Sequence, residues 1–435
     1  MRKGDRRLQI HVVESGETLF SIANMYSTSI FALTEANELE TPNLVVGQAL
    51  VIPIIGEYYF VQPGDSLFSI SEMMQISVEQ LARVNNIQVG QVLPVGLRLY
   101  IPPKMKEDIT TFGYIEPLGD RFSTALENAA RKHSPSLTYI APFSYRVNRD
   151  GTLSPPLLNL LQEIATNNDT ALSFVVTNLE GASFSSELAH IVLTVQAVQN
   201  RLIDEITNSA VANGFKDVHI DFEFIYPNDR AAYNEFLQKL KSRLAPSGLQ
   251  LSSALAPKTS RTQSGLLYEA HDYAFHGENN DFVVLMTYEW GYSAGPPLPV
   301  SPINEVEKVL TYALTEIPRE KILMGQNLYG YDWTLPFVQG ESFARAISPQ
   351  QAIQLAREHR VAIQYDETAQ APFFEYMDMD GKEHIVWFED ARSIQAKFNL
   401  VKRLGLLGIA YWKLGLAFPQ NWLLLNDQFI VRKIV

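Results

Sequence analysis

The chain of 435 residues contains no cysteine. Disulfide frameworks, zinc–thiolate sites and cysteine nucleophiles are therefore excluded. Long apolar runs are missing as well, since no stretch of 18 apolar residues is present that could span a bilayer. The basic residues 1–7 lead into His11-Val12-Val13-Glu14 and not into an apolar segment. We therefore expect neither a signal peptide nor a membrane partner.

Positive charge is scarce, with 35 Lys and Arg against 48 Asp and Glu and a net charge of −13. Without a basic stripe to neutralise phosphates, nucleic acid is not an expected partner. No cluster of His, Asp and Glu has the spacing of a metal site, so we expect no metal. Charged residues at 19% and apolar residues at 46% are typical of a folded globular protein. The length predicts two or three domains with a large core.

The first hundred residues contain an internal repeat. The segment 12–23 recurs at 60–71, and the segment 46–53 recurs at 95–102. Apolar residues at helical spacing follow the first turn of each copy, so each copy predicts strand, helix, helix, strand. An acid followed by Thr or Ser precedes each first helix, which indicates a helix N-cap.

Both copies resemble LysM modules. They share a Gly-Glu/Asp-Thr/Ser-Leu opening, an asparagine after the second helix, and a Gly-x-x-Leu-x-Ile-Pro close. The resemblance implies βααβ modules at residues 1–55 and 56–104 that bind glycans containing N-acetylglucosamine. It assigns this binding to Gly16, Thr18, Leu19, Asn37, Gly64, Ser66, Leu67 and Asn85. The alternative is a targeting or assembly module without sugar affinity.

From residue 105 to residue 435 the chain alternates between strand-like apolar runs and helical stretches. Eight runs predict a (β/α)8 TIM barrel. They are residues 111–115, 137–142, 171–176, 218–224, 249–255, 282–288, 322–328 and 407–412. Between the seventh and eighth runs, at about residues 334–390, we expect a small α+β insertion with a hairpin turn at Asp378-Met379-Asp380-Gly381. This insertion forms either one wall of the substrate cleft or an addition to the surface without a functional role.

The fourth run carries the candidate chemistry. Side chains alternate along a strand, so Asp221 and Glu223 share one face, while Ile220, Phe222 and Phe224 share the other. Parallel barrels place their chemistry at this end of the strands. Two close carboxylates do not both ionise cheaply, so one keeps its proton near neutral pH, as a general acid requires. The alternative is a solvent-facing strand end with two ordinary acids.

Residues 109–435 resemble glycoside hydrolase family 18. Asp221 and Glu223 match the last two acids of the family's Asp-x-x-Asp-x-Asp-x-Glu motif, whereas His219 and Lys216 replace the other two. Two further segments match strand ends of the family: Met286-Thr287-Tyr288-Glu289-Trp290 and Gly408-Ile409-Ala410-Tyr411-Trp412.

The resemblance implies substrate-assisted hydrolysis that retains the anomeric configuration and uses no cofactor. Glu223 is the implied acid and base, Asp221 holds the substrate's acetamido N–H, and Tyr288 orients the acetamido oxygen. Trp412 offers a platform to the sugar ring. Further candidates for the cleft are Tyr114, Met286, Glu289, Asn327 and Tyr331. We read His219 as a neutral residue behind Asp221.

Two LysM modules before a compact family 18 barrel resemble the spore-cortex peptidoglycan hydrolases of spore-forming bacteria. This implies a monomeric N-acetylglucosaminidase that acts on cortex glycan or its fragments during germination and is located in the spore. The alternatives are a general chitinase or cell-wall autolysin, and a glycan-binding spore-coat protein with an inactive barrel. We expect the modules to fold alone and the barrel, from about residue 109, to work without them.

Overall fold

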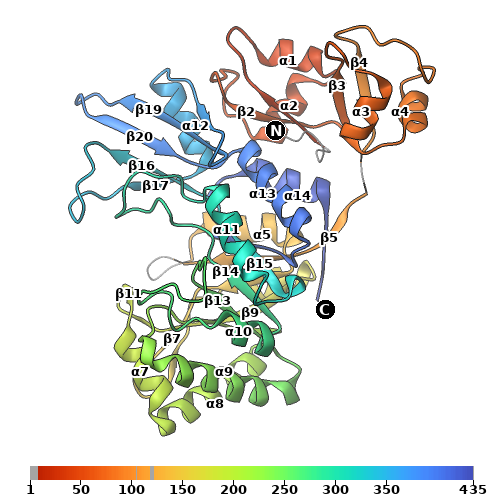
Figure 1. Cartoon of the computed structure of the whole chain (residues 1–435). Coiled ribbons are helices and arrows are strands. Elements are labelled where there is room, and N and C mark those ends of the chain that lie inside the picture. Colours follow the sequence, from red (N-terminus) through yellow and green to blue (C-terminus); the bar gives the residue numbers. More distant parts are fainter. Residues whose placement is uncertain (1–7, 104, 118–121, 435) are drawn as a thin grey trace.

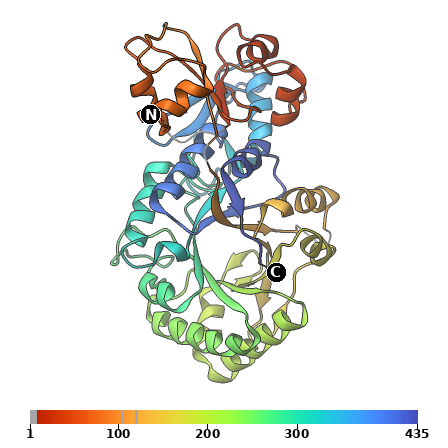
Figure 2. The ribbon, with the colours of Figure 1, turned by 90° about the vertical axis from the view of Figure 1, so that its right-hand side faces the viewer.

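The computed structural model describes residues 8–103, 105–117 and 122–434. Residues 1–7, on which part of the signal-peptide expectation rests, and Lys104, at the expected domain boundary, lie outside the described residues. In the described part, no helix is both long enough and apolar enough to cross a membrane. Figures 1 and 2 place the two N-terminal modules, in red and orange, at one end of the molecule, next to the blue helices near the C-terminus.

Eight parallel strands close into a barrel, which confirms the expected fold. In chain order they are β5 (Glu107–Ile115), β6 (Tyr139–Pro142), β9 (Ala171–Thr177), β12 (Asp217–Asp221), β13 (Gln250–Leu255), β14 (Phe282–Leu285), β15 (Ile322–Asn327) and β21 (Gly408–Trp412). Each pairs with the next, and β21 pairs with β5 to close the ring. The strands are almost wholly buried because helices cover their outer faces while side chains fill the interior.

Helices surround the barrel, and the helical stretch between β9 and β12 is broken in two. They are α5 (Thr124–His133), α6 (Leu161–Asn167), α7 (Ser186–Thr194), α8 (Gln196–Ala212), α9 (Arg230–Leu244), α10 (Tyr273–Asn279), α11 (Ile303–Ala313), α13 (Ala391–Leu404) and α14 (Pro419–Gln428). Helices α7 and α8 are separate because Val195, between them, is extended. At this break, the Gln199 side chain donates to the Leu193 carbonyl oxygen at 2.7 Å, so this carbonyl group near the end of α7 has a hydrogen-bond partner.

The insertion is an antiparallel sheet with one helix, placed beside the barrel (Figure 1). Its elements are β16 (Gly330–Thr334), β17 (Arg345–Ile347), α12 (Pro349–Glu358), β18 (Gln364–Asp366), β19 (Ala371–Met377) and β20 (Glu383–Trp387). The sheet order is β17-β16-β20-β19-β18, so the sheet already includes Gly330, ahead of the expected start near residue 334. The hairpin turn between β19 and β20 is confirmed, with the Asp378 N–H donating to the Lys382 carbonyl oxygen at 3.0 Å.

Each LysM copy has the expected order of strand, helix, helix, strand. The first has β1 (Gln9–Val12), α1 (Leu19–Met25), α2 (Ile30–Asn37) and β2 (Ala49–Ile52); the second has β3 (Glu57–Phe60), α3 (Leu67–Met74), α4 (Val78–Val84) and β4 (Arg98–Ile101). Thr18 and Ser66 are the N-caps of α1 and α3, each in a reciprocal capping box with the serine three residues on.

Candidate active site

The inner face of β12 carries a row of polar side chains to the mouth of the barrel. Asp217, His219 and Asp221 are all buried, and Glu223 follows just after the strand ends. The backbone of Glu223 is held by Asn178, which accepts from its N–H at 3.0 Å and donates to its carbonyl oxygen at 2.9 Å. This bond pair fixes the position from which the carboxylate projects.

The outer face of β12 confirms the alternation only in part. Ile220 and Phe222 are fully buried, as expected. Phe224 is not on this face: the strand ends at Asp221, and Phe224 has a φ of +54° and is 38% exposed. The expected period of two fails here because the chain turns out of the barrel.

A cavity of about 630 Å³ opens where the carboxyl ends of the strands meet. Seven of the sequence-predicted residues line it: Tyr114, Asp221, Glu223, Met286, Tyr288, Glu289 and Trp412. The structure therefore brings residues from four different strand ends to one site. This is the position at which barrels of this architecture hold their substrates.

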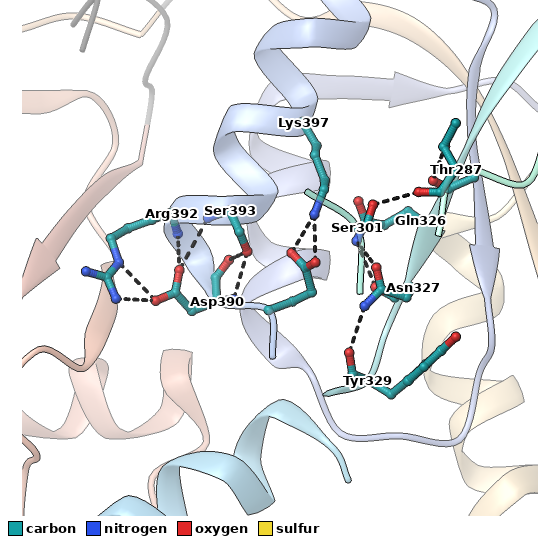
Figure 3. Close-up of polar contacts among 11 residues, drawn as sticks. Thr287, Ser301, Gln326, Asn327, Tyr329, Asp390, Arg392, Ser393 and Lys397 are labelled. Atoms are coloured by element: carbon teal, nitrogen blue, oxygen red, sulfur yellow. Dashed lines mark hydrogen bonds and ion pairs between the residues drawn. The ribbon is translucent and has the colours of Figure 1, made fainter. Parts of the chain in front are cut away.

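Two predicted cleft residues are not in the lining. Asn327 is fully buried, and its amide donates to the Tyr329 carbonyl oxygen at 2.7 Å, as Figure 3 shows. Its expected role in the cleft is therefore wrong, because the side chain is used inside the protein. Tyr331 lies behind the cavity, and its hydroxyl donates to a carboxylate oxygen of Glu289 at 3.1 Å. Tyr329 donates to the same carboxylate.

The acid pair has the electrostatics that the sequence predicts. Burial raises the pKa of Glu223 well above its usual value, and the nearby charge of Asp221 raises it further. Burial also raises the pKa of Asp221, to about 7. The Asp221 Oδ1 atom is buried without a hydrogen-bond partner among the described residues. One proton shared by such a pair remains bound near neutral pH.

Behind Asp221 runs a chain of buried hydrogen bonds. Tyr114 Oη lies 2.8 Å from His219 Nε2, and His219 Nδ1 lies 2.8 Å from Ser252 Oγ. Ser252 and Ser173 both donate to Asp217 Oδ2, at 2.8 and 2.6 Å. Since Ser252 uses its proton on Asp217, it accepts from His219 Nδ1–H, and Nε2 is left to accept from Tyr114. Burial lowers the pKa of His219 to about 3, so this histidine is neutral, as the sequence indicated.

Asp217 is the ionisable residue of this hydrogen-bond network that was not predicted from the sequence. It stands two positions before His219, so the same alternation that links Asp221 to Glu223 was sufficient to place it inside the barrel. Burial raises the pKa of Asp217 to about 7. The two serine donors, from β9 and β13, carry no sequence signal, because their meeting depends on strand register.

The cavity has further lining residues. They are Glu116, Phe143, Arg146, Leu179, Gly181, Ala182, Phe184, Pro257, Leu267, Tyr268 and Trp290. Of these, Glu116 follows the first barrel strand as a weaker cleft candidate of the sequence and Trp290 belongs to the motif at 286–290, whereas the others were not predicted. Most of them follow a barrel strand, which was the available signal. The rings of Phe143 and Tyr114 meet the Trp412 ring edge-on at 4.9 and 5.3 Å, and this holds the indole in place.

Several of the predicted LysM glycan-binding residues have structural roles. Leu19 and Leu67 are buried in the cores of their modules. Asn37 is fully buried and bonds the main chain of Val51 in both directions, at 2.8 Å each way. Asn85 makes the same two bonds to Tyr100. The expected glycan contacts of these four side chains are therefore not supported.

The remaining predicted LysM residues are exposed at the start of the first helix of each copy. Gly16 and Gly64 occupy turns with φ near +87°, and Thr18 and Ser66 are the exposed N-caps. Phe20 and Phe68, at the next exposed position, are 65% and 61% exposed. Among residues 8–103, 105–117 and 122–434, no group of three His, Asp or Glu side chains is arranged to hold a metal ion.

Comparisons with known proteins agree with these features. The model of glycosyl hydrolases family 18 matches residues 123–417, and the LysM domain model matches residues 11–53 and 59–102. A cortical fragment-lytic enzyme of Bacillus subtilis (strain 168) is 56% identical over 427 residues, covering 98% of this chain and 99% of that protein. The crystal structure of the spore cortex-lytic enzyme SleL of Bacillus megaterium QM B1551 superposes with a TM-score of 0.92 at 48% identity, covering 98% of this chain and 99% of that one. A chitinase from Chromobacterium violaceum, at 24% identity and a TM-score of 0.68, shares the fold.

Proposed function

The chain belongs to glycosyl hydrolase family 18, as its motifs predicted, and from this premise we propose that it is a retaining N-acetylglucosaminidase of spore-cortex peptidoglycan. The chain is a glycosidase with two LysM domains, a combination that indicates binding to peptidoglycan or chitin-like glycans. The choice of cortex glycan, and of the spore as the place of action, rests on relatives that match along nearly their whole length.

The observation that carries the proposal is the buried pair of Asp221 and Glu223 at the mouth of the barrel. Glu223 holds a proton near neutral pH because burial and the Asp221 charge both raise its pKa. It gives that proton to the glycosidic oxygen as the bond from C1 to that oxygen breaks. The same carboxylate then takes a proton from the water that attacks C1, which restores the acid.

The nucleophile is the substrate's own 2-acetamido oxygen, which bonds to C1 and forms an oxazolinium ion. Asp221 is suited to hold the acetamido N–H, because its Oδ1 atom is buried without a partner among the described residues. Its negative charge stabilises the cation that develops. Water then attacks C1 from the face that the leaving group has vacated, opposite the acetamido oxygen, and opens the oxazolinium ring. The configuration at C1 is therefore retained.

Tyr288 and Trp412 position the sugar in this scheme. Both line the cavity. The hydroxyl of Tyr288 stays protonated because burial raises its pKa well above the usual value, so it can donate to the acetamido oxygen. Trp412 offers its apolar face to the pyranose ring. Met286 and Glu289, which also line the cavity, complete this side of the sugar site.

Product analysis tests the proposal. The protein is incubated separately with purified cortex fragments and with N-acetylglucosamine oligomers from chitin, and the products are identified by mass. We expect cortex fragments to be cut after N-acetylglucosamine, with the β configuration retained in early products. Faster cleavage of chitin oligomers would favour the general chitinase. Binding without cleavage of either substrate would favour the glycan-binding coat protein.

A further inference from the structure

The two LysM modules differ in how they meet the rest of the molecule. Strand β2 of the first module is buried along its whole length, whereas β4, its counterpart in the second, has an exposed arginine at its start. Ala49 and Val51 of β2 belong to the same apolar core as the barrel. One face of the two-stranded sheet packs against the module's own helices. The barrel helices α13 and α14 contact β2 and cover its other face.

The repeat positions that make this contact have diverged. Val45, Ala49 and Val51 of the first module correspond to Pro94, Arg98 and Tyr100 of the second. Val45 is 6% exposed and packs in the core of the insertion. The second module instead has a core made only of its own residues, between 59 and 101. The small apolar side chains therefore give the first module an apolar face that docks on the barrel and the insertion. The second module has no such face at the equivalent positions.

Polar contacts tie the docked module to both of its neighbours. Gln420 of α14 donates to the Ala49 carbonyl oxygen at 2.8 Å and to Asn37 Oδ1 at 3.1 Å. On the side of the insertion, the Ile363 N–H donates to the Val46 carbonyl oxygen at 2.9 Å. The first module thus contacts the barrel and the insertion at once.

Arg392 completes the joint from α13. Its guanidinium donates to the Gly47 carbonyl oxygen at 3.1 Å and is held by Asp390 at 2.6 and 2.9 Å. Figure 3 shows Arg392 and Asp390 extending toward the first module, away from Lys397. Lys397 pairs with Glu389, the residue before Asp390, on the side of the barrel. Arg392 is 8% exposed, so this contact is built into the interior. A buried, charge-assisted contact of this kind is lost only when the surfaces separate.

We propose that the first LysM module is a structural part of the catalytic unit and clamps the insertion against α13 and α14. The second module is attached through the first, to which Arg98 and the Tyr58 N–H donate hydrogen bonds. The clamp bears on the cavity because β16 of the insertion carries Tyr331, whose hydroxyl donates to Glu289 in the cavity wall. Our expectation that the barrel from residue 109 works without the modules is accordingly replaced by a dependence on the first module.

A matched pair of glycines provides the test. Gly47 and Gly96 are equivalent in the repeat, and both have a φ of +83°, so alanine brings the same backbone strain to each. A Cβ atom on residue 47 would lie 1.9 Å from the Ile363 carbonyl oxygen, whereas one on residue 96 meets nothing within 4 Å. The two variants therefore differ chiefly in their effect on the docked surface.

We expect Gly47→Ala to lower the melting temperature of the catalytic unit by about 5 °C or more, and Gly96→Ala to leave that transition unchanged. Hydrogen exchange on the unmodified full-length protein is the second measurement. We expect the amides of β1 and β2 to be protected as long as those of β5 and β21, and the amides of β3 and β4 to exchange earlier.

Failure of Gly47→Ala to fold, with Gly96→Ala folded, also supports the clamp, because strain confined to an independent module leaves the barrel intact. Equal effects of the two variants on the barrel transition would overturn it, as would equally early exchange of both LysM sheets. Neither readout depends on the substrate, so the outcome is separate from that of the proposed glycosidase function. Gln420→Glu, which sets a carboxylate against two oxygen acceptors, provides a second variant with the same expected loss.

Discussion

At the residue scale, the arrangement that supports catalysis is a carboxyl group kept protonated by its surroundings. Glu223 sits in a cavity lined by aromatic rings, and Asp221, whose charge acts on it, has the same sign of charge. Both effects disfavour the charged form, so the acid keeps its proton at a pH at which a free glutamate has lost it. Its backbone is fixed by Asn178, so the proton is delivered from a defined position.

Replacing Glu223 by glutamine tests this role. The amide keeps the size of the side chain but has no acidic proton, so we expect hydrolysis of cortex fragments to fall by roughly a thousandfold or more. The melting temperature and glycan binding are expected to stay near those of the unmodified protein. Steady-state rates and a pull-down on insoluble peptidoglycan provide the two measurements. Activity within tenfold of the unmodified enzyme would contradict the assignment of Glu223.

Asp221→Asn is expected to lower turnover strongly and also to change the pH profile. Since the Asp221 charge is the second cause of the raised pKa of Glu223, its removal lowers that pKa. The reaction needs protonated Glu223, so the residual activity of the variant is lost at a lower pH than in the unmodified enzyme. The profile of kcat/KM against pH measures this shift of the alkaline limb. A limb that stays in place would show that Asp221 does not influence Glu223.

His219→Asn separates a positioning role from a titrating one. The imidazole is neutral over the working range, because burial lowers its pKa to about 3. We therefore expect the variant to keep both limbs of the pH profile, with a moderate loss of rate from the loosened Tyr114 hydroxyl. Movement of the acid limb by a unit or more would show instead that His219 exchanges a proton with the site.

The sequence predicted the cavity residues at the ends of the barrel strands, and it failed where a side chain is used inside the protein. Asp221, Glu223, Tyr288 and Trp412 come together because parallel strands end at one edge. Asn327 also ends a strand, but its amide is used by the main chain of Tyr329. Asn327 and the four cavity residues all lie at or just beyond a strand end, so this position alone does not separate them, and the local path of the backbone does.

At the element scale, the alternation of strands and helices predicted all eight barrel strands, and the insertion as an added unit. The same alternation does not show where α7 ends and α8 begins, because Val195, which separates them, has neither Gly nor Pro beside it. The two LysM copies raise the same difficulty. Their repeat predicts equal folds, yet the exposure of β2 and β4 differs because a neighbouring surface covers only one of them.

The joint between β14 and β15 depends on a residue without a side chain. A Cβ atom on Gly325 would lie 2.4 Å from the Leu285 carbonyl oxygen and 2.9 Å from the ring of Tyr288. We therefore expect Gly325→Ala to push these strands apart, to lower the melting temperature by several degrees, and to reduce kcat/KM by moving Tyr288. Thermal unfolding and kinetics on the same sample provide the check. A variant with unchanged stability and rate would show that the strands relax around the added methyl group.

At the scale of the whole molecule, both described ends of the chain are tied to the barrel. Near the N-terminus, the Leu8 N–H donates to an Asp427 carboxylate oxygen at 2.9 Å. After α14, β22 (Phe429–Val431) pairs with the start of β5. Beyond β22, Lys433 donates to the Leu137 carbonyl oxygen at 2.8 Å. The C-terminal segment thus covers the end of the barrel opposite the catalytic cavity.

Removal of residues 429–435 tests how much this cover contributes. Phe429 is 4% exposed and belongs to the main core, so its loss alone is expected to cost about 3 kcal/mol. For a unit of this size, that corresponds to a drop in melting temperature of about 4 °C. Arg432→Ala is the control, because its contact with Asp108 is 4.0 Å long and largely exposed, and such pairs contribute little. Since the cover lies far from Glu223, the truncated enzyme is expected to retain its rate at temperatures below its transition. A loss of rate without a loss of stability would mean that the two ends of the barrel are coupled.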